Sequence, residues 1–201
     1  MLKPPRVFDE EHEAWRWPWY ECAAEFLGTA ILVFLATSIS AVLVINYSSH
    51  GYQDIIRALY TGIALTCVYT IFGRISGGHF NPIVTIGFSM IGKFHSGLAF
   101  IYIGSQVLGG FCGGFLAFIV NSNGIEGRFD KEEYETSTDL AAIFGPVQDY
   151  RVFWFLPFFN AILAAYVLLV IMNAINDFKN ENVPLELKPI LYGVFAYSGM
   201  T

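Results

Sequence analysis

Residues 76–85 read Ser-Gly-Gly-His-Phe-Asn-Pro-Ile-Val-Thr, and they follow an apolar segment, residues 55–75, that is long enough to cross a bilayer. The two glycines allow a sharp turn of the backbone. The asparagine followed by proline is typical of a helix start, with asparagine as N-cap and proline at the first helical position. The chain then stays apolar until Gly92. The pattern predicts a short helix of roughly 15 Å, about half of a hydrocarbon core of ~30 Å.

A half-helix inside a membrane is tolerated only where its irregular backbone faces protein or a water-filled cavity. Its N-terminus would place unpaired N–H groups and partial positive charge near the middle of the bilayer, where such groups can exclude cations from a pore. On spacing alone, two interpretations remain. One is a re-entrant pore loop, and the other is an interfacial helical hairpin with an ordinary Asn81–Pro82 cap.

The composition of the chain indicates an integral membrane protein. Of 201 residues, 55% are hydrophobic and only 14% are charged, and the mean hydropathy is +0.51. The net charge of −6 argues against a nucleic-acid partner. The four histidines and three cysteines show no metal-binding or redox spacing, so we expect neither a metal nor a cofactor. The sequence also shows no nucleophile–base pair that would indicate an enzyme.

Residues 76–85 resemble the first pore-loop signature of the major intrinsic protein family, the aquaporins and aquaglyceroporins. The family pattern is Ser-Gly-(Gly/Ala)-His-X-Asn-Pro-Ala-Val-Thr, and the alanine is replaced here by Ile83. Residues 24–29, Ala-Glu-Phe-Leu-Gly-Thr, resemble the start of the family's first helix. Residues 174–184 resemble a connector of the glycerol-conducting branch, Ala-Ile-X-Asp-X-X-Asn-X-X-Val-Pro. The chain therefore resembles an aquaglyceroporin.

The resemblance implies an all-α membrane fold, a right-handed bundle of transmembrane helices with a re-entrant half-helix. We expect residues 1–20 to be a cytoplasmic segment and residues 21–201 to be the membrane domain. The second Asn-Pro half-helix and the sixth helix of the family are not found in this domain, so the resemblance implies a C-terminally truncated chain. The expected bundle is incomplete, with about four full spans and the start of a fifth. The expected helices cover 21–45, 55–75, 96–120, 152–174 and the residues from 189, with a long acidic insertion at 121–150.

The resemblance also implies a substrate path built around the 76–85 segment. Asn81 would donate its side-chain amide to passing solutes, and Ile83 would crowd the point where two half-helices meet. Thr61 and Met200 fall at two positions of the family's narrow filter, where Thr61 departs from the usual aromatic residue. The residues expected to line the path through their backbone or side chains are Gly77, Gly78, His79, Phe80, Asn81, Pro82, Ile83, Thr61 and Met200.

Two polar residues at membrane depth are candidate structural anchors. An ionisable side chain such as Glu25 is costly in a membrane and is a functional candidate by default. The resemblance implies that Glu25 holds the pore loop through hydrogen bonds, and a proton relay is the alternative. Gln106 resembles the glutamine in a Gln-X-X-Gly pattern of the family, and we expect a structural packing role for it.

Gly110 and Gly114 are expected to let helices approach closely.

Asn46 begins a glycosylation sequon, Asn-Tyr-Ser, in an expected extracellular loop. With the N-terminus taken as cytoplasmic, seven of eleven Lys and Arg residues fall on the cytoplasmic side, as the positive-inside rule requires. The resemblance implies a multi-pass protein of the plasma membrane or an intracellular membrane.

The function implied is a passive channel for water and small neutral solutes such as glycerol. The expected partners are membrane lipid and family members in a homo- or hetero-tetramer. Because the second half-helix is not found, an alternative is a truncated, non-conducting form that associates with full-length channels and modulates them.

Overall fold

The computed structural model describes residues 17–46, 52–129, 141, 143–145, 155–176, 184 and 187–198, and the predicted residue Met200 lies outside them. Within these ranges the labelled elements are all helices. The predicted all-α membrane fold is confirmed. The helices are α1 Trp19–Asn46, α2 Gln53–Ser76, α3 Pro82–Met90, α4 Ser96–Arg128, α7 Leu156–Asn176 and α8 Lys188–Ser198.

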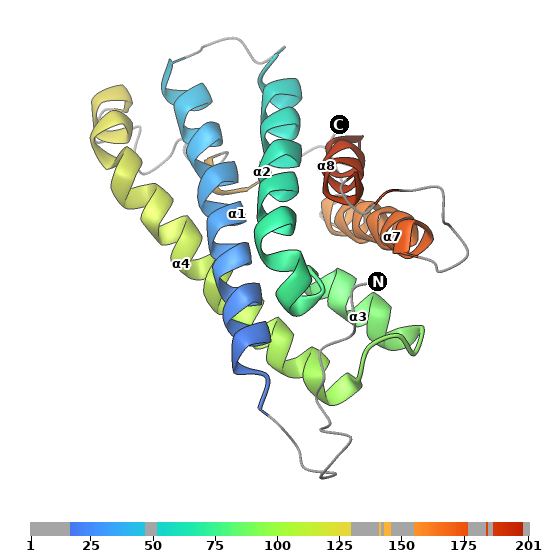
Figure 1. The fold of residues 1–201 in the computed structure, drawn as a ribbon. Helices are drawn as coiled ribbons and strands as arrows, with labels where there is room; N and C mark the ends of the chain where they lie inside the picture. The colour runs from blue at the N-terminus through green and yellow to red at the C-terminus, as the bar shows by residue number, and fades with distance from the viewer. Residues whose placement is uncertain are drawn as a thin grey trace.

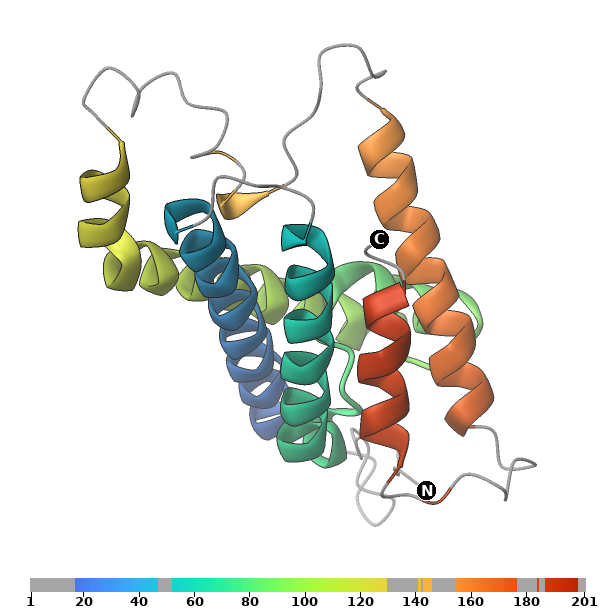
Figure 2. The same cartoon turned by 90° about the horizontal axis from the view of Figure 1, so that it is seen from above.

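The long helices stand side by side, and α3 lies across one end of them. Figure 1 shows α1 beside α2, with α4 running obliquely along α1. Figure 2 shows α8 beside α2 and α7 on the outside. Within the described ranges α1, α2 and α4 are long and apolar enough to cross a membrane. The nine residues of α3 cover only about 14 Å, roughly half of a hydrocarbon core.

The predicted start of the short helix is confirmed. Asn81 is the N-cap of α3, with an extended backbone and a side chain that accepts a hydrogen bond from the Ile83 N–H at 2.8 Å. Pro82 occupies the first helical position, where its missing N–H costs nothing. The preceding helix α2 ends at Ser76, and Gly77 caps it in the left-handed conformation.

The prediction that helix 96–120 ends at Val120 was wrong, because α4 continues to Arg128. The polar composition after Val120 favoured a loop, but Ile125 is fully buried in a small core with Ala41, Val44 and Ile143. Burial of this apolar side chain stabilises two more turns of helix despite their weak helix propensity. At ~50 Å, α4 is longer than a hydrocarbon core is thick, and its C-terminal end lies at the end of the bundle where α2 begins (Figure 1).

The prediction that Gly110 and Gly114 form the close helix contact was also wrong by one residue. A Cβ at Gly109 would collide with the Phe26 carbonyl of α1, and a Cβ at Gly113 would collide with the Ala30 carbonyl. The nearest atoms to Cβ positions at Gly110 and Gly114 belong to Val33, at ordinary distances of 3.8 and 4.0 Å. Both pairs have the same spacing of four, so only the rotation of α4 decides which pair faces α1.

A second close contact joins α8 to α2, where a Cβ at Gly193 would collide with the Gly62 carbonyl. The larger apolar core lies where α2, α3, α7 and α8 meet. Its buried members are Val68, Tyr69, Phe80, Val84, Phe88, Leu169, Met172 and Tyr192. This core fixes the place of α3 against the longer helices. The end of α3 is also tied to α7, since the Lys93 ammonium donates to the Asn173 side chain.

The two glycine positions on α4 make a matched test of this packing. Gly109→Ala must push α1 and α4 apart, and overpacking of this kind costs about 1–3 kcal/mol. A Cβ in Gly110→Ala makes only an ordinary van der Waals contact with Val33, and the better helix propensity of alanine should leave stability unchanged or raise it by up to ~1 kcal/mol. The measurement is the thermal unfolding midpoint of each purified variant in detergent. Equal midpoints for the two variants would contradict the observed rotation of α4.

Candidate functional site

The candidate site is the loop between α2 and α3, residues 77–81, whose backbone is folded back on itself. Gly77, Gly78 and Phe80 have φ angles of 95°, 74° and 46°, all in the left-handed region. Glycine adopts this region freely, but for Phe80 it stores strain of order 1–3 kcal/mol. The surrounding structure must therefore hold Phe80 in place.

Glu25 of α1 holds the loop through hydrogen bonds to its backbone and to neighbouring side chains. Its side chain is fully buried, and Oε1 accepts hydrogen bonds from the Ser76 hydroxyl at 2.6 Å and from the His79 N–H at 3.0 Å. Oε2 accepts from the Phe80 N–H at 2.8 Å and from the Gln106 amide at 2.7 Å. A buried carboxylate is tolerated when such donors surround it, and hydrogen bonds to a charged acceptor are the strong ones.

A second layer of polar side chains supports these contacts. Gln106 of α4 also donates to the Thr85 hydroxyl of α3, at 2.9 Å. Because a carboxylate only accepts, the atom of Gln106 that faces Glu25 must be its nitrogen. The Tyr102 hydroxyl donates to the Ser76 carbonyl at 2.9 Å, which pairs a carbonyl at the end of α2. Side chains of α1, α3 and α4 therefore converge on one turn of backbone.

Steric contacts also restrict the loop. A Cβ at Gly78 would meet the Tyr69 ring and the Cα of Gly73, so this position needs glycine for space as well as for its φ angle. The buried Phe80 ring lies against Gly28 of α1, where any Cβ would collide with it. The loop is thus held by a carboxylate on its polar side and by close packing on its apolar side.

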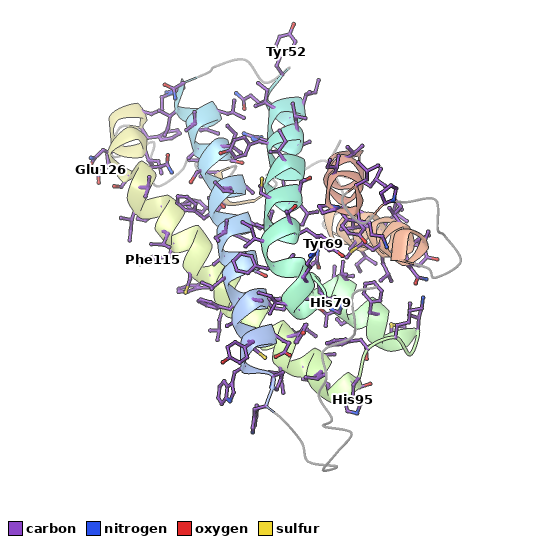
Figure 3. The ribbon with its side chains drawn as sticks, in the orientation of Figure 1. Tyr52, Tyr69, His79, His95, Phe115 and Glu126 are labelled. Atoms are coloured by element: carbon purple, nitrogen blue, oxygen red, sulfur yellow. The ribbon has the colours of Figure 1, made fainter. Side chains whose placement is uncertain are left out.

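The His79 side chain is enclosed by aromatic rings, and the place of this residue on a solute path stays a prediction. Its imidazole is buried and stacks on Phe88 with ring centres 5.0 Å apart. Phe94 and Tyr102 pack edge-on against the same ring. Figure 3 shows His79 at the end of α2, where the chain enters α3. Only the backbone of His79 remains as a candidate for contact with a solute.

Asn81 keeps one polar group for other partners. Its carboxamide oxygen accepts from the Ile83 N–H at 2.8 Å, and its backbone carbonyl accepts from the Thr85 N–H. Within the described ranges, no hydrogen bond is formed by the side-chain NH₂ group. This half-buried donor lies at the N-terminus of α3, where the helix dipole places partial positive charge. The arrangement can donate to a neutral solute and repel a cation.

The remaining predicted residues lie apart from this loop. Thr61 lies on α2 fifteen residues before Ser76, which is about 22 Å along the helix, and it lines a separate cavity. Asn46 is the last residue of α1 instead of a loop residue, and its amide donates to the Val42 carbonyl. No cluster of three His, Cys, Asp or Glu side chains suited to a metal occurs among the residues that the structure describes.

Sequence reasoning assigned no role to Ser76, Thr85 or Tyr102, although all three belong to the network around Glu25. One signal was available. Tyr102 lies four residues before Gln106, so both residues occupy one face of α4. The contact of Ser76 with Glu25 links residues 51 apart, and no local pattern reveals it.

Comparison with known proteins gives a consistent result. The sequence profile described as "Major intrinsic protein" matches residues 11–183. The glycerol uptake facilitator protein of Pseudomonas aeruginosa is 27% identical over 179 residues, which are 87% of this chain and 63% of that protein. Aquaporin-9 of Mus musculus is 30% identical over 177 residues, 87% of this chain and 59% of the relative. The chain thus spans about three fifths of the length of these two curated relatives.

A relative that matches over fewer residues has a higher sequence identity. The probable glycerol uptake facilitator protein of Thermotoga maritima is 40% identical over 97 residues, which are 48% of this chain and 42% of that protein. Among solved structures, the aquaglyceroporin from Plasmodium falciparum aligns with a TM-score of 0.75 at 23% identity. That alignment covers 92% of this chain and 73% of the other. At this identity the likeness concerns the fold.

The hydrogen bonds of Glu25 lead to a prediction about the loop. Glu25→Gln replaces one acceptor oxygen by an NH₂ group and leaves buried donors unpaired, which costs about 1–3 kcal/mol for each donor. We expect the backbone amides of His79 and Phe80 to exchange hydrogen roughly 100-fold faster, as a loss of ~3 kcal/mol would produce. The measurement is hydrogen exchange of the purified protein read by mass spectrometry.

Glu21→Gln is the control for this prediction. Glu21 is also buried and lies one turn before Glu25 on α1, but no hydrogen bond from the loop reaches it. Exchange at the loop should stay unchanged in this variant. Similar exchange rates in both variants would show that Glu25 does not hold the loop.

Proposed function

The chain belongs to the major intrinsic protein family, whose members are passive channels and not enzymes, and on this premise we propose that it conducts water and small neutral solutes such as glycerol across a membrane. The observation that carries the proposal is the loop of residues 77–81, which Glu25 holds so that Asn81 begins the half-helix α3. The supporting relatives are named glycerol uptake facilitators and aquaporins.

In the proposed mechanism Asn81 orients each passing molecule. Its oxygen already accepts from the Ile83 N–H, and its NH₂ group is the donor that can bind a solute. Water and the hydroxyl groups of glycerol accept such a hydrogen bond. Because the cap fixes the carboxamide, the donor does not reorganise as each solute passes.

Backbone carbonyls of residues 77–80 supply the acceptors along the proposed path. A solute that leaves water loses hydrogen bonds, and carbonyl groups replace them, as in other narrow pores. The left-handed conformations of Gly77, Gly78 and Phe80 aim successive carbonyls away from the helical direction. The carboxylate of Glu25 accepts from the His79 and Phe80 N–H groups of the same loop, and we propose that the loop carbonyls face solutes.

We propose that the N-terminus of α3 excludes cations from the path. Its N-terminus carries partial positive charge at the proposed midpoint of the membrane, so a cation that loses water there is repelled. Ile83 follows directly and is bulkier than the alanine of the family pattern. Together with Pro82 it would narrow the path at this point and favour slender solutes.

We further propose a cytoplasmic N-terminus and assembly with copies of this chain or with family members as tetramers in membrane lipid. Arg74 in the last turn of α2 and Lys188 at the start of α8 support this orientation, because these two helix ends lie near the end of the bundle where α1 begins (Figure 2). An epitope attached before Trp17 should be reached by antibody only after the membrane is permeabilised. Cross-linking in native membranes should give bands up to a tetramer.

Flux in liposomes tests the channel directly. Stopped-flow measurements on vesicles that contain the purified chain should show fast water and glycerol transport with low activation energy. Asn81→Asp replaces the donor NH₂ group by a second acceptor and adds negative charge, so we expect flux to fall by at least ~10-fold, the loss of one hydrogen bond to a solute. Wild-type flux no higher than that of empty vesicles would contradict the proposal.

A further inference from the structure

The turn of residues 91–95 joins α3 to α4 and lies outside the loop of residues 77–81 (Figure 1). Lys93 and His95 in this turn are exposed, whereas the side chain of Phe94 between them is half-buried. The Phe94 ring packs against the larger apolar core. The turn therefore connects a surface segment of the protein to its interior through one aromatic side chain.

The Phe94 ring contacts two aromatic side chains that adjoin the candidate site. Its centre lies 4.7 Å from that of His79, with an angle of 63° between the rings. It lies 4.8 Å from the centre of the Tyr102 ring. Both distances fall in the range of favourable aromatic pairs. Because His79 also stacks on Phe88, these four residues form one aromatic cluster.

The three rings around His79 differ in how they are anchored. Phe88 belongs to α3 and Tyr102 belongs to α4, so the backbone hydrogen bonds of a helix fix both of them. The Tyr102 hydroxyl is also held, since it donates to the Ser76 carbonyl at 2.9 Å. Of the three, only Phe94 comes from a turn. Its place therefore depends on the conformation of residues 91–95.

A helix cap at the C-terminal end of α3 fixes that conformation. Gly92 has a φ angle of 71°, in the left-handed region. Its N–H donates to the Ser89 carbonyl at 3.1 Å, and the Lys93 N–H donates to the Phe88 carbonyl at 3.0 Å. This pair of hydrogen bonds around a left-handed glycine is a Schellman motif. The chain reverses at Gly92, and Phe94 follows two residues later.

The residues on either side of Phe94 tie the turn to two further helices. The Lys93 ammonium donates to the Asn173 side chain of α7. His95 is the N-cap of α4, and its Nδ1 atom accepts from the Gly97 N–H at 3.1 Å. The turn is therefore held at α3, α7 and α4, and Phe94 is the residue through which it contacts His79.

The His79 ring is in turn connected to the loop of the candidate site. Its Nδ1 atom lies 3.1 Å from the Thr85 hydroxyl of α3, and the His79 N–H donates to Glu25 of α1 at 3.0 Å. Phe80 follows directly, with a φ angle of 46° that persists only while its surroundings hold it. Loss of support for the ring therefore allows the loop to relax.

We propose that Phe94 is a positioning residue of the solute path, which acts through the His79 ring on the backbone of residues 77–81. It contacts no solute itself. The inference rests on the channel proposed above, because the carbonyls of this loop are the acceptors of the proposed path. Hydrogen exchange of the loop amides tests the positioning independently of flux.

Phe94→Leu keeps an apolar side chain and removes the ring. We expect the backbone amides of His79 and Phe80 to exchange about tenfold faster, the effect of losing one aromatic pair. Glycerol flux in liposomes should fall by at least ~2-fold, because small displacements of aligned groups are costly. Phe94→Tyr restores the ring and should return both exchange and flux to near the wild-type values. Leucine and tyrosine would be equivalent if Phe94 only filled apolar space.

Phe118→Leu is the matched control. Phe118 is also partly buried and pairs with one aromatic ring, that of Phe144 at 6.1 Å, but it packs against the small core around Ile125. It lies sixteen residues after Tyr102, about 24 Å along α4. Both leucine variants should lower the thermal unfolding midpoint of the full chain. Only Phe94→Leu should change loop exchange and flux.

A pair of variants at Gly92 decides the result if Phe94→Leu does not fold. A Cβ at this position meets nothing within 4 Å, so only the φ angle restricts it. Asparagine adopts the left-handed region readily, whereas the β-branched valine does not. Gly92→Val should therefore speed loop exchange and lower flux as Phe94→Leu does. Gly92→Asn should leave both near the wild-type values.

Four outcomes would overturn the proposal. One is unchanged loop exchange in both Phe94→Leu and Gly92→Val, and another is equally faster exchange in Phe118→Leu, which would indicate a general loss of stability. The third is faster loop exchange with full flux, and the fourth is no recovery in Phe94→Tyr. Wild-type liposomes without flux would contradict the channel, but faster loop exchange specific to Phe94→Leu would still assign the positioning of the loop to Phe94. Wild-type flux with unchanged loop exchange in the variants would leave the channel standing and remove this role.

Discussion

A buried carboxylate is the constraint on which the rest of the structure depends. Glu25 has no contact with solvent, so each of its oxygens must find donors inside the protein. It finds them in the N–H groups of His79 and Phe80, the Ser76 hydroxyl and the Gln106 amide. The strained backbone at Phe80 persists because these bonds, together with packing, outweigh its cost. The position of α3 follows from the same contacts.

Close helix packing makes this network possible. Gly28 lies three residues after Glu25 on α1, and Gly109 lies three residues after Gln106 on α4. Without a Cβ at Gly109 the two backbones approach closely, and the Gln106 amide comes within 2.7 Å of the carboxylate. The absence of a Cβ at Gly28 leaves room for the Phe80 ring. Small residues thus set the distances over which the polar groups act.

The two ends of α2 differ in how their polar groups are paired. At its C-terminal end the polar groups of the Glu25 network pair with one another, which gives a rigid loop and an Asn81 side chain with one free donor group. At its N-terminal end Arg57 donates to Asp54 and Gln53 beside a cavity, and its buried Nε atom has no hydrogen-bond partner within the described ranges.

The sequence by itself determined the membrane class, the family, the Asn81 cap of α3 and the identity of Glu25 as a residue with a special role. Each follows from composition or from residues adjacent in the chain, where local geometry decides the outcome. Only the tertiary structure decided that α4 runs to Arg128, because burial of Ile125 against α1 outweighs a polar local sequence. It also decided that Gly109 faces α1 and that His79 is enclosed by aromatic rings. Those features depend on the rotation of one helix against another, which contacts between distant residues set and no local pattern contains.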